Sequence, residues 1–172
     1  MAKKKNYHEC LTTPLETGIR NFNNVAKFYL YYAPNLDTAQ SKIKIESMGG
    51  EIIFDYMLKE TGLKDKYKVL TKIQPTSWKK YELDNDIIDF EKSAVIMKKM
   101  KNESCLQALL RHIRNALAHG YIYVWKKEKG NYILFVDYDS AGVNKKCTAK
   151  ILVSMSILEK WKEIIEHQIG NI

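Results

Sequence analysis

The chain has 172 residues and is poor in several features that mark specialised protein classes. Its three cysteines, Cys10, Cys105 and Cys147, are scattered and form no C-x-x-C pair, so neither a disulfide framework nor a zinc knuckle is indicated. A reducing cytoplasm is the expected location. No apolar run approaches the roughly 18 residues of a membrane-spanning helix, and no apolar stretch follows the basic start, so neither a membrane span nor a secretory signal is expected.

Sequence signatures of common nucleotide, metal and DNA sites are also missing. Gly49-Gly50 is not followed by a Lys-Ser/Thr pair, so these glycines do not form a P-loop. No helix-turn-helix spacing surrounds a basic helix, which makes a DNA-binding regulator the weaker alternative. The histidines are dispersed and are accompanied by no H-E-x-x-H motif or carboxylate cluster, so no metal or other cofactor is expected. These four histidines are His8, His112, His119 and His167.

Positive charge is abundant and is concentrated in one part of the chain. The net charge is +8, and residues 91–130 contain nine basic and only three acidic side chains. Such a cluster attracts a polyanion, with nucleic acid the first candidate. A lysine-rich surface that only maintains solubility is the alternative, and charge alone leaves both open.

Helical periodicity dominates the first two thirds of the chain. Thr13-Pro14-Leu15-Glu16 has the pattern of a helix start, with a cap, a first-turn proline and an acidic residue three positions after the cap. Further helices are expected from Asp37 toward Lys59, ending before Gly62, from about Asp84 to Met100, and from the capping box at Ser104 to Gly120.

The period changes after Gly120. Aromatic and β-branched residues alternate with turn signals, which predicts strands at Tyr121–Trp125, Tyr132–Asp137 and Cys147–Val153. A last capping box at Ser156 predicts a helix over 156–169. We therefore expect a single, mainly α domain over residues 1–172: a helical bundle (14–120), with a small antiparallel three-stranded meander (121–153) inserted before the C-terminal helix.

The helix expected at 104–120 has a clear apolar stripe. Leu106, Leu110, Ile113 and Leu117 fall within about 40° of Leu106 at 3.6 residues per turn. The side away from this stripe is expected to carry polar side chains that suit acid–base chemistry on a phosphodiester, because imidazole exchanges protons near neutral pH and guanidinium matches two phosphate oxygens. These residues are Arg111, His112, Arg114, Asn115 and His119.

A non-catalytic interpretation of the same residues stays open. A histidine near a helix C-terminus is often only a favourable charge at the negative end of the helix dipole, and arginines opposite a core stripe are often solvated. Likewise, Tyr121, Tyr123 and Trp125 could stack on unpaired bases, or they could form the packed face of a small sheet.

The string Arg114-Asn115-Ala116-Leu117-Ala118-His119 resembles the signature of the HEPN superfamily (higher eukaryotes and prokaryotes nucleotide-binding domains). That signature is an Arg followed by a polar residue, with a His four to six residues after the Arg, near the end of a helix in an all-α bundle. The resemblance covers residues 14–120. It implies a metal-independent endoribonuclease in which the RNA 2′-hydroxyl attacks the adjacent phosphate and leaves a 2′,3′-cyclic phosphate.

The resemblance also implies residue roles and partners. His119 would be the general acid or base, Arg114 would neutralise the phosphate, and Asn115 would orient the groups, with Arg111 and His112 as weaker RNA-binding candidates. Motif helices of two subunits commonly form a composite cleft, so a homodimer is expected. Many such proteins are toxins or antiviral defence effectors, and some pair with an antitoxin or regulatory protein. The alternative is a catalytically inactive HEPN module that binds RNA, a nucleotide or a protein partner.

Overall fold

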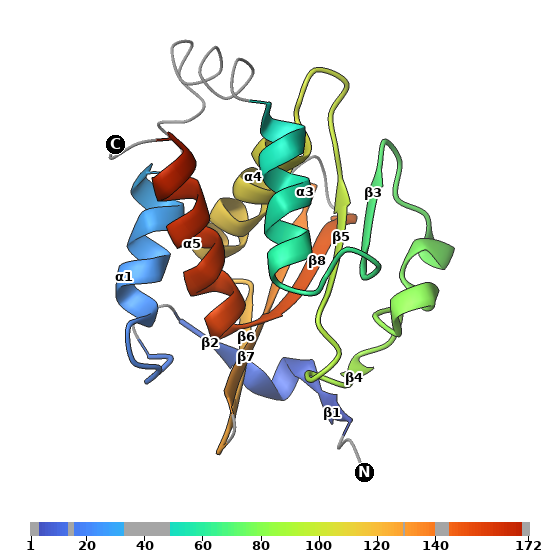
Figure 1. Ribbon diagram of the computed structural model, residues 1–172. Coiled ribbons are helices and arrows are strands. Elements are labelled where there is room, and N and C mark those ends of the chain that lie inside the picture. The colour runs from blue at the N-terminus through green and yellow to red at the C-terminus, as the bar shows by residue number, and fades with distance from the viewer. Residues whose placement is uncertain (1–3, 14–15, 33–48, 129, 140–144, 170–172) are drawn as a thin grey trace.

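In the computed structural model the α-helices lie together on one face of a mixed β-sheet (Figure 1). The structure describes residues 4–13, 16–32, 49–128, 130–139 and 145–169. The helices of this part are α1 (Phe22–Lys27), α3 (Gly50–Glu60), α4 (Cys105–His119) and α5 (Met155–Ile169). Its strands are β1 (Lys5–Asn6), β2 (Leu11–Thr12), β3 (Tyr67–Leu70), β4 (Ile87–Ile88), β5 (Ala94–Lys98), β6 (Ile122–Lys127), β7 (Gly130–Tyr138) and β8 (Cys147–Ser154).

Six of these strands form one sheet in the order β2-β6-β7-β8-β5-β3. β6, β7 and β8 are consecutive and antiparallel, and β5 pairs antiparallel with β8. β3 pairs parallel with β5, with Tyr67 opposite Val95, while β1 and β4 form a separate two-stranded ladder. The prediction of a mainly helical bundle with a three-stranded meander is therefore wrong. The meander exists, but it is the centre of a six-stranded mixed sheet.

The segment 84–100, predicted to be helical, forms β4 and β5 instead. Val95, Ile96 and Met97 are fully buried, because one face of β5 packs against the helices and the other against the opposite layer. A strand buried on both faces has a continuous apolar run in place of an alternating one. Such a run cannot be distinguished from a buried helix by periodicity alone, which explains the error.

The first helix begins later than its sequence predicted. The hydroxyl of Thr13 donates to Glu16 at 2.9 Å and the Glu16 backbone N–H to the Thr13 carbonyl at 3.0 Å, so the capping signal closes a turn. The chain then takes a left-handed conformation at Asn21 (φ 65°), and α1 starts at Phe22. A π-helical segment, Phe28–Tyr32, follows it directly.

The second predicted helix is described only in its C-terminal half, because residues 33–48 lie outside the described residues. α3 begins at Gly50, after Gly49 with φ 72°. Its predicted end is confirmed: the backbone N–H of Leu63 donates to the carbonyl of Leu58 at 2.8 Å, and that of Gly62 to Lys59 at 3.2 Å. This pair of bonds is the Schellman arrangement that a left-handed glycine permits.

The last helix is capped two residues earlier than predicted. Ser154, the final residue of β8, accepts a hydrogen bond from the backbone N–H of Ile157 at 3.3 Å. α5 therefore starts at Met155, not at Ser156. Trp161 on α5 is fully buried in the helix layer, where its indole N–H donates to the hydroxyl of Thr61 at 3.1 Å.

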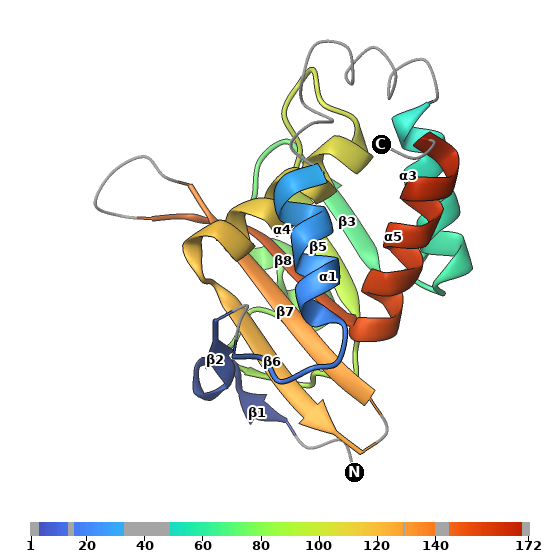
Figure 2. The ribbon, with the colours of Figure 1, turned by 90° about the vertical axis from the view of Figure 1, so that its left-hand side faces the viewer.

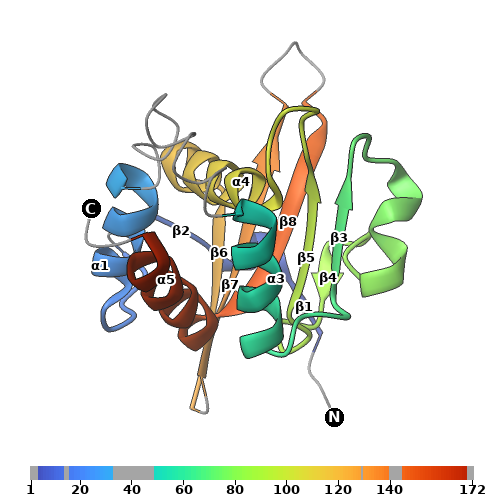
Figure 3. The same ribbon diagram turned by 45° about the horizontal axis from the view of Figure 1, so that its top comes forward.

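The two faces of the sheet are covered differently. Figure 3 shows α1, α3, α4 and α5 on one side. The other face packs against Tyr7 and Cys10, and against residues of the 78–90 segment. Tyr123 is only 4% exposed there and meets Tyr7 edge-on at 4.8 Å, and Trp125 meets Phe90 at 5.4 Å. Of the two interpretations of the β6 aromatics, the packed face is therefore confirmed.

Candidate active site at the end of helix α4

Hydrogen bonds fix both ends of α4, and both ends lie where the sequence predicted. At the start, Ser104 accepts from the Gln107 backbone at 3.2 Å, and the Gln107 side chain accepts from the Ser104 backbone at 2.8 Å. At the other end, Gly120 (φ 72°) reverses the chain, and the N–H of Tyr121 donates to the carbonyl of Ala116 at 2.9 Å. Figure 2 shows that α4 leads through this turn directly into β6. The last turn of α4 therefore has little freedom to shift.

Arg114 and His119 are exposed near this end of α4. Neither side chain makes a hydrogen bond or an ion pair with any residue that the structure describes. A guanidinium and an imidazole that have no internal partner are available to bind a ligand from solvent. Lys145 lies near the same end, where it donates to the hydroxyl of Tyr121 at 3.1 Å and adds positive charge beside the motif.

Asn115 has a different environment from its two neighbours in the motif. Its side chain is half-buried, and its Nδ2 donates to Oδ2 of Asp137 on β7 at 3.3 Å. Asp137 is only 3% exposed. The amide is thus tied to the sheet, while Arg114 and His119 extend from the helix without such a tie.

His112 is fully buried, so the expectation that it lies on the exposed side of the helix is wrong. Its Nδ1 lies 2.6 Å from Oδ2 of Asp137, and its Nε2 lies 2.7 Å from the backbone carbonyl oxygen of Lys98. The reason is that α4 packs against β5 and β7 as well as against α3 and the π-helical segment. A helix covered on two sides buries more than one stripe, and His112 has no exposed atom to offer RNA.

Arg111 is also held within the protein. Its guanidinium makes two hydrogen bonds to the carboxylate of Glu103, at 2.7 and 2.9 Å, and a third to the Lys98 carbonyl at 3.2 Å. Burial would raise the pKa of Glu103, but hydrogen bonds from Arg111 and from the Met100 backbone outweigh it and lower that pKa. Arg111 therefore anchors the start of α4, and its side chain is 20% exposed.

Asp137 was not among the residues singled out in the sequence. A signal for it existed in the alternation of β7, because Ile133 and Phe135 face the helix layer and Asp137 follows two residues later on the same face. A carboxylate on an apolar face needs a hydrogen-bonding partner. The partners are His112 and Asn115, which lie three residues apart on α4.

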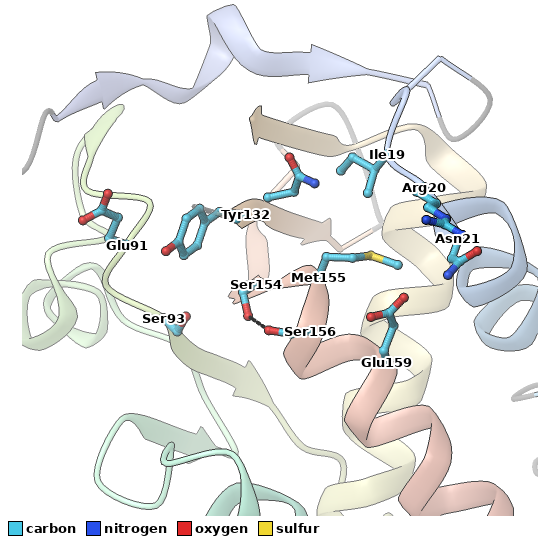
Figure 4. Close-up of a pocket in the computed structure, with 12 residues that line it drawn as sticks. Ile19, Arg20, Asn21, Glu91, Ser93, Tyr132, Ser154, Met155, Ser156 and Glu159 are labelled. Atoms are coloured by element: carbon cyan, nitrogen blue, oxygen red, sulfur yellow. Dashed lines mark hydrogen bonds between the residues drawn. The ribbon is translucent and has the colours of Figure 1, made fainter. Parts of the chain in front are cut away.

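A hollow lies elsewhere, at the opposite end of β6 and β7 (Figure 4). It has a volume of about 660 Å³ and includes Arg20, Tyr132, Ser154 and Glu159 among its lining residues. The length of β6, six residues at about 3.3 Å each, puts roughly 20 Å between this hollow and the end of α4. Arg114, Asn115 and His119 do not line this hollow.

The described residues contain neither a group of side chains that could bind a metal ion nor a helix that could cross a membrane. Among the residues that the structure describes, no three His, Cys, Asp or Glu side chains gather closely enough to share a metal ion. In the same residues, no helix has the length and apolar character that crossing a membrane requires.

Comparison with known proteins agrees with the resemblance seen in the motif. A family model described as HEPN pEK499 p136 matches residues 17–171, which include α1, α3, α4 and α5 and the strands β3 to β8. No curated protein and no solved structure shows significant similarity to the chain. Five of the six strands of the large sheet thus lie within the matched domain, and only β2 precedes it. The chain belongs to the HEPN family, as its Arg114–His119 string predicted.

Proposed function

We propose that this protein is a metal-independent endoribonuclease whose active residues lie at the end of α4. The observation that carries the proposal is the state of Arg114 and His119, which are exposed and have no partner among the described residues, in a chain of the HEPN family. A solubility function would not need a guanidinium and an imidazole at these two motif positions. Phosphodiester cleavage needs both chemistries.

In the proposed reaction the RNA 2′-hydroxyl attacks the adjacent phosphorus. The 2′-oxygen gives up its proton to a base and forms the new O–P bond, and the 5′-oxygen leaves with a proton from an acid. His119 supplies the acid–base group, because imidazole can give or accept a proton near neutral pH. Arg114 neutralises the phosphate oxygens as charge develops on them. Asn115 orients the reacting groups.

One helix does not bring these groups to a single phosphate. Arg114 and His119 are five residues apart, which corresponds to about 140° around an ideal helix. We propose that a second copy of the chain supplies the complementary group, so that a homodimer forms one composite cleft. Two copies of His119 would then provide one base and one acid.

The proposed biological role is that of a toxin or an antiviral defence effector that an antitoxin or regulatory protein restrains. Support for this role comes from the family resemblance alone. Induced expression of the wild-type protein should then arrest growth, and expression of His119→Ala should not. Equal growth in both cultures would count against the toxin role.

The decisive experiment compares purified wild-type protein with Arg114→Ala and His119→Ala on mixed RNA in EDTA. We expect cleavage by the wild type only, with 2′,3′-cyclic phosphate and 5′-hydroxyl ends. Matched controls are Arg20→Ala and His167→Ala, which remove an exposed Arg and an exposed His away from the motif and should leave cleavage unchanged.

Two outcomes would overturn the proposal. If both motif variants cleave as fast as the wild type, Arg114 and His119 do not carry the reaction. If folded wild-type protein binds RNA saturably but yields no new ends, the protein is a binding module. A salt titration of that binding would measure how many phosphate contacts it makes.

A further inference from the structure

We infer that Asp137 is a positioning residue that fixes the side-chain amide of Asn115, so that Asn115 presents its carbonyl oxygen as the acceptor for the 2′-hydroxyl of RNA. This inference rests on the proposed nuclease function and assigns a task within it. Asp137 lies on β7, 22 residues beyond Asn115 in the chain, and is not part of the motif.

The hydrogen bonds around Asp137 determine which way the amide of Asn115 points. The Nε2 of His112 lies 2.7 Å from the carbonyl oxygen of Lys98, which can only accept, and 3.3 Å from Nη2 of Arg111, which can only donate. We assign Nε2 as the donor in the shorter of these two contacts. The Nδ1 of His112 and the Oδ2 of Asp137, 2.6 Å apart, share a second hydrogen. Whichever of these two atoms holds that hydrogen, Oδ2 keeps a lone pair for a further donor.

Asn115 therefore offers its nitrogen, not its oxygen, to Asp137. Its Nδ2 lies 3.3 Å from Oδ2, whereas a flipped amide would set two acceptor oxygens against each other. Water cannot relieve that conflict readily, because Asp137 is 3% exposed and His112 is fully buried. The flipped state should be roughly 10–100-fold less populated, which is the usual consequence of an unsatisfied buried polar group.

With its nitrogen held inward, Asn115 directs Oδ1 away from the carboxylate. Oδ1 accepts no hydrogen bond from any described residue, and Arg114 and His119 extend from the same helical turns. An outward acceptor directly beside a phosphate-binding guanidinium suits a hydroxyl donor on the substrate. The 2′-hydroxyl of ribose is such a donor, and deoxyribose lacks it.

The test is a double-mutant cycle on cleavage. Asp137→Asn changes few atoms but allows an NH₂ group to face Asn115. We therefore expect kcat to fall about 100-fold, as for other misplaced active-site groups, while KM stays within about threefold of the wild-type value. Asn115→Ala should lose a similar factor, and the double variant should lose no more than either single variant, since both changes remove one function. If the loss of kcat in the double variant equals the product of the two single losses, Asp137 acts only on the fold, and the inference is overturned.

A matched control is Asp89→Asn. Asp89 is also buried, at 5% exposed, and its Oδ1 accepts from the Glu91 backbone at 3.1 Å, an acceptor role that asparagine can keep. We expect wild-type kcat and KM for it. If Asp89→Asn loses as much kcat as Asp137→Asn, replacement of any buried aspartate suffices and the positioning role is wrong.

A measurement without catalysis separates this inference from the nuclease proposal. In the wild-type protein, the ¹⁵N–¹H spectrum should show the side-chain amide of Asn115 with one hydrogen slowed in solvent exchange by its bond to Asp137. Free exchange of both hydrogens would overturn the inference even in a protein that cleaves RNA. Slow exchange in a protein that cleaves no RNA would support the positioning of Asn115 by Asp137 and would reject the proposed nuclease function.

Discussion

His112 and His119 lie seven residues apart on one helix, and they have opposite environments. His112 is fully buried between α4 and the sheet, where its Nδ1 faces Asp137 and its Nε2 faces the Lys98 carbonyl, whereas His119 is exposed at the last position of the helix. Seven residues is two turns, so the two side chains project in similar directions from the helix axis. The sheet covers the first and does not reach the second.

This contrast predicts different costs for the same substitution. His112→Ala leaves a cavity and a buried Asp137 without its main partner, so we expect the free energy of unfolding to fall by about 3 kcal/mol. His119→Ala removes an exposed side chain and should change that free energy by less than about 0.5 kcal/mol. Urea unfolding followed by circular dichroism measures both, and comparable losses would contradict the burial difference.

The glycines that end α3 and α4 allow the effect of backbone strain on stability to be separated from its effect on RNA cleavage. Gly62 (φ 68°) and Gly120 (φ 72°) have the same left-handed conformation, and a Cβ would meet no atom within 4 Å at either position. Alanine should therefore cost about 1 kcal/mol of stability at each site, from backbone strain alone. Only Gly120 follows His119 directly, so Gly120→Ala should slow RNA cleavage and Gly62→Ala should not. Equal cleavage rates at matched stability would show that the position of His119 does not matter.

Glu103 predicts a specific pH dependence of stability. Its pKa in the folded protein lies below the ordinary value of 4.5, so its ion pair with Arg111 stabilises the fold above that pH and is lost as the pH falls through the folded pKa. Glu103→Gln should lower stability by about 2 kcal/mol at neutral pH, and the difference from wild type should narrow below pH 4.5. Chemical unfolding at several pH values tests this. Glu163→Gln, which breaks an exposed pair with Lys160, is the control and should change little.

The cysteines should be slow to react while the protein is folded. Burial, with hydrogen bonding to Glu51, raises the pKa of Cys105 to about 12, and burial raises that of Cys147 to about 11. Burial also raises the pKa of Cys10. At pH 8 the thiolate fraction of Cys147 is then about one in a thousand, and the thiolate is the reactive form. Iodoacetamide should label the thiols much faster in urea than in buffer, and rapid labelling of the folded protein, read by mass spectrometry, would contradict this.

The sequence predicted features that depend on a few neighbouring residues. Ser104, Gln107 and Gly120 define α4 through hydrogen bonds within one turn, and these bonds form regardless of what packs nearby. The turn signals that separate β6, β7 and β8 are local in the same sense. The family assignment also followed from a short string at the end of this helix.

The features that the sequence did not predict correctly depend on distant parts of the chain. Val95, Ile96 and Met97 form a strand because β3 and β8 lie on either side of them, and nothing in their own order requires it. A helical wheel identifies one apolar face, so it could not show that the sheet also covers His112. The role of Asp137 depends on its two hydrogen-bond partners on α4, and the folding of β7 against that helix brings Asp137 to them.

The place of β8 in the sheet has a consequence for synthesis of the chain. β8 lies between β7 and β5, so the pair β3–β5 and the strands β2, β6 and β7 stay in separate halves until residues 147–154 are made. Joining these halves closes long loops, which is a slow kind of folding step. A growing polypeptide will therefore carry the complete Arg114–His119 string for some time without the finished surface that supports it. The surface at the end of α4 is therefore completed only after residues 147–154 have left the ribosome.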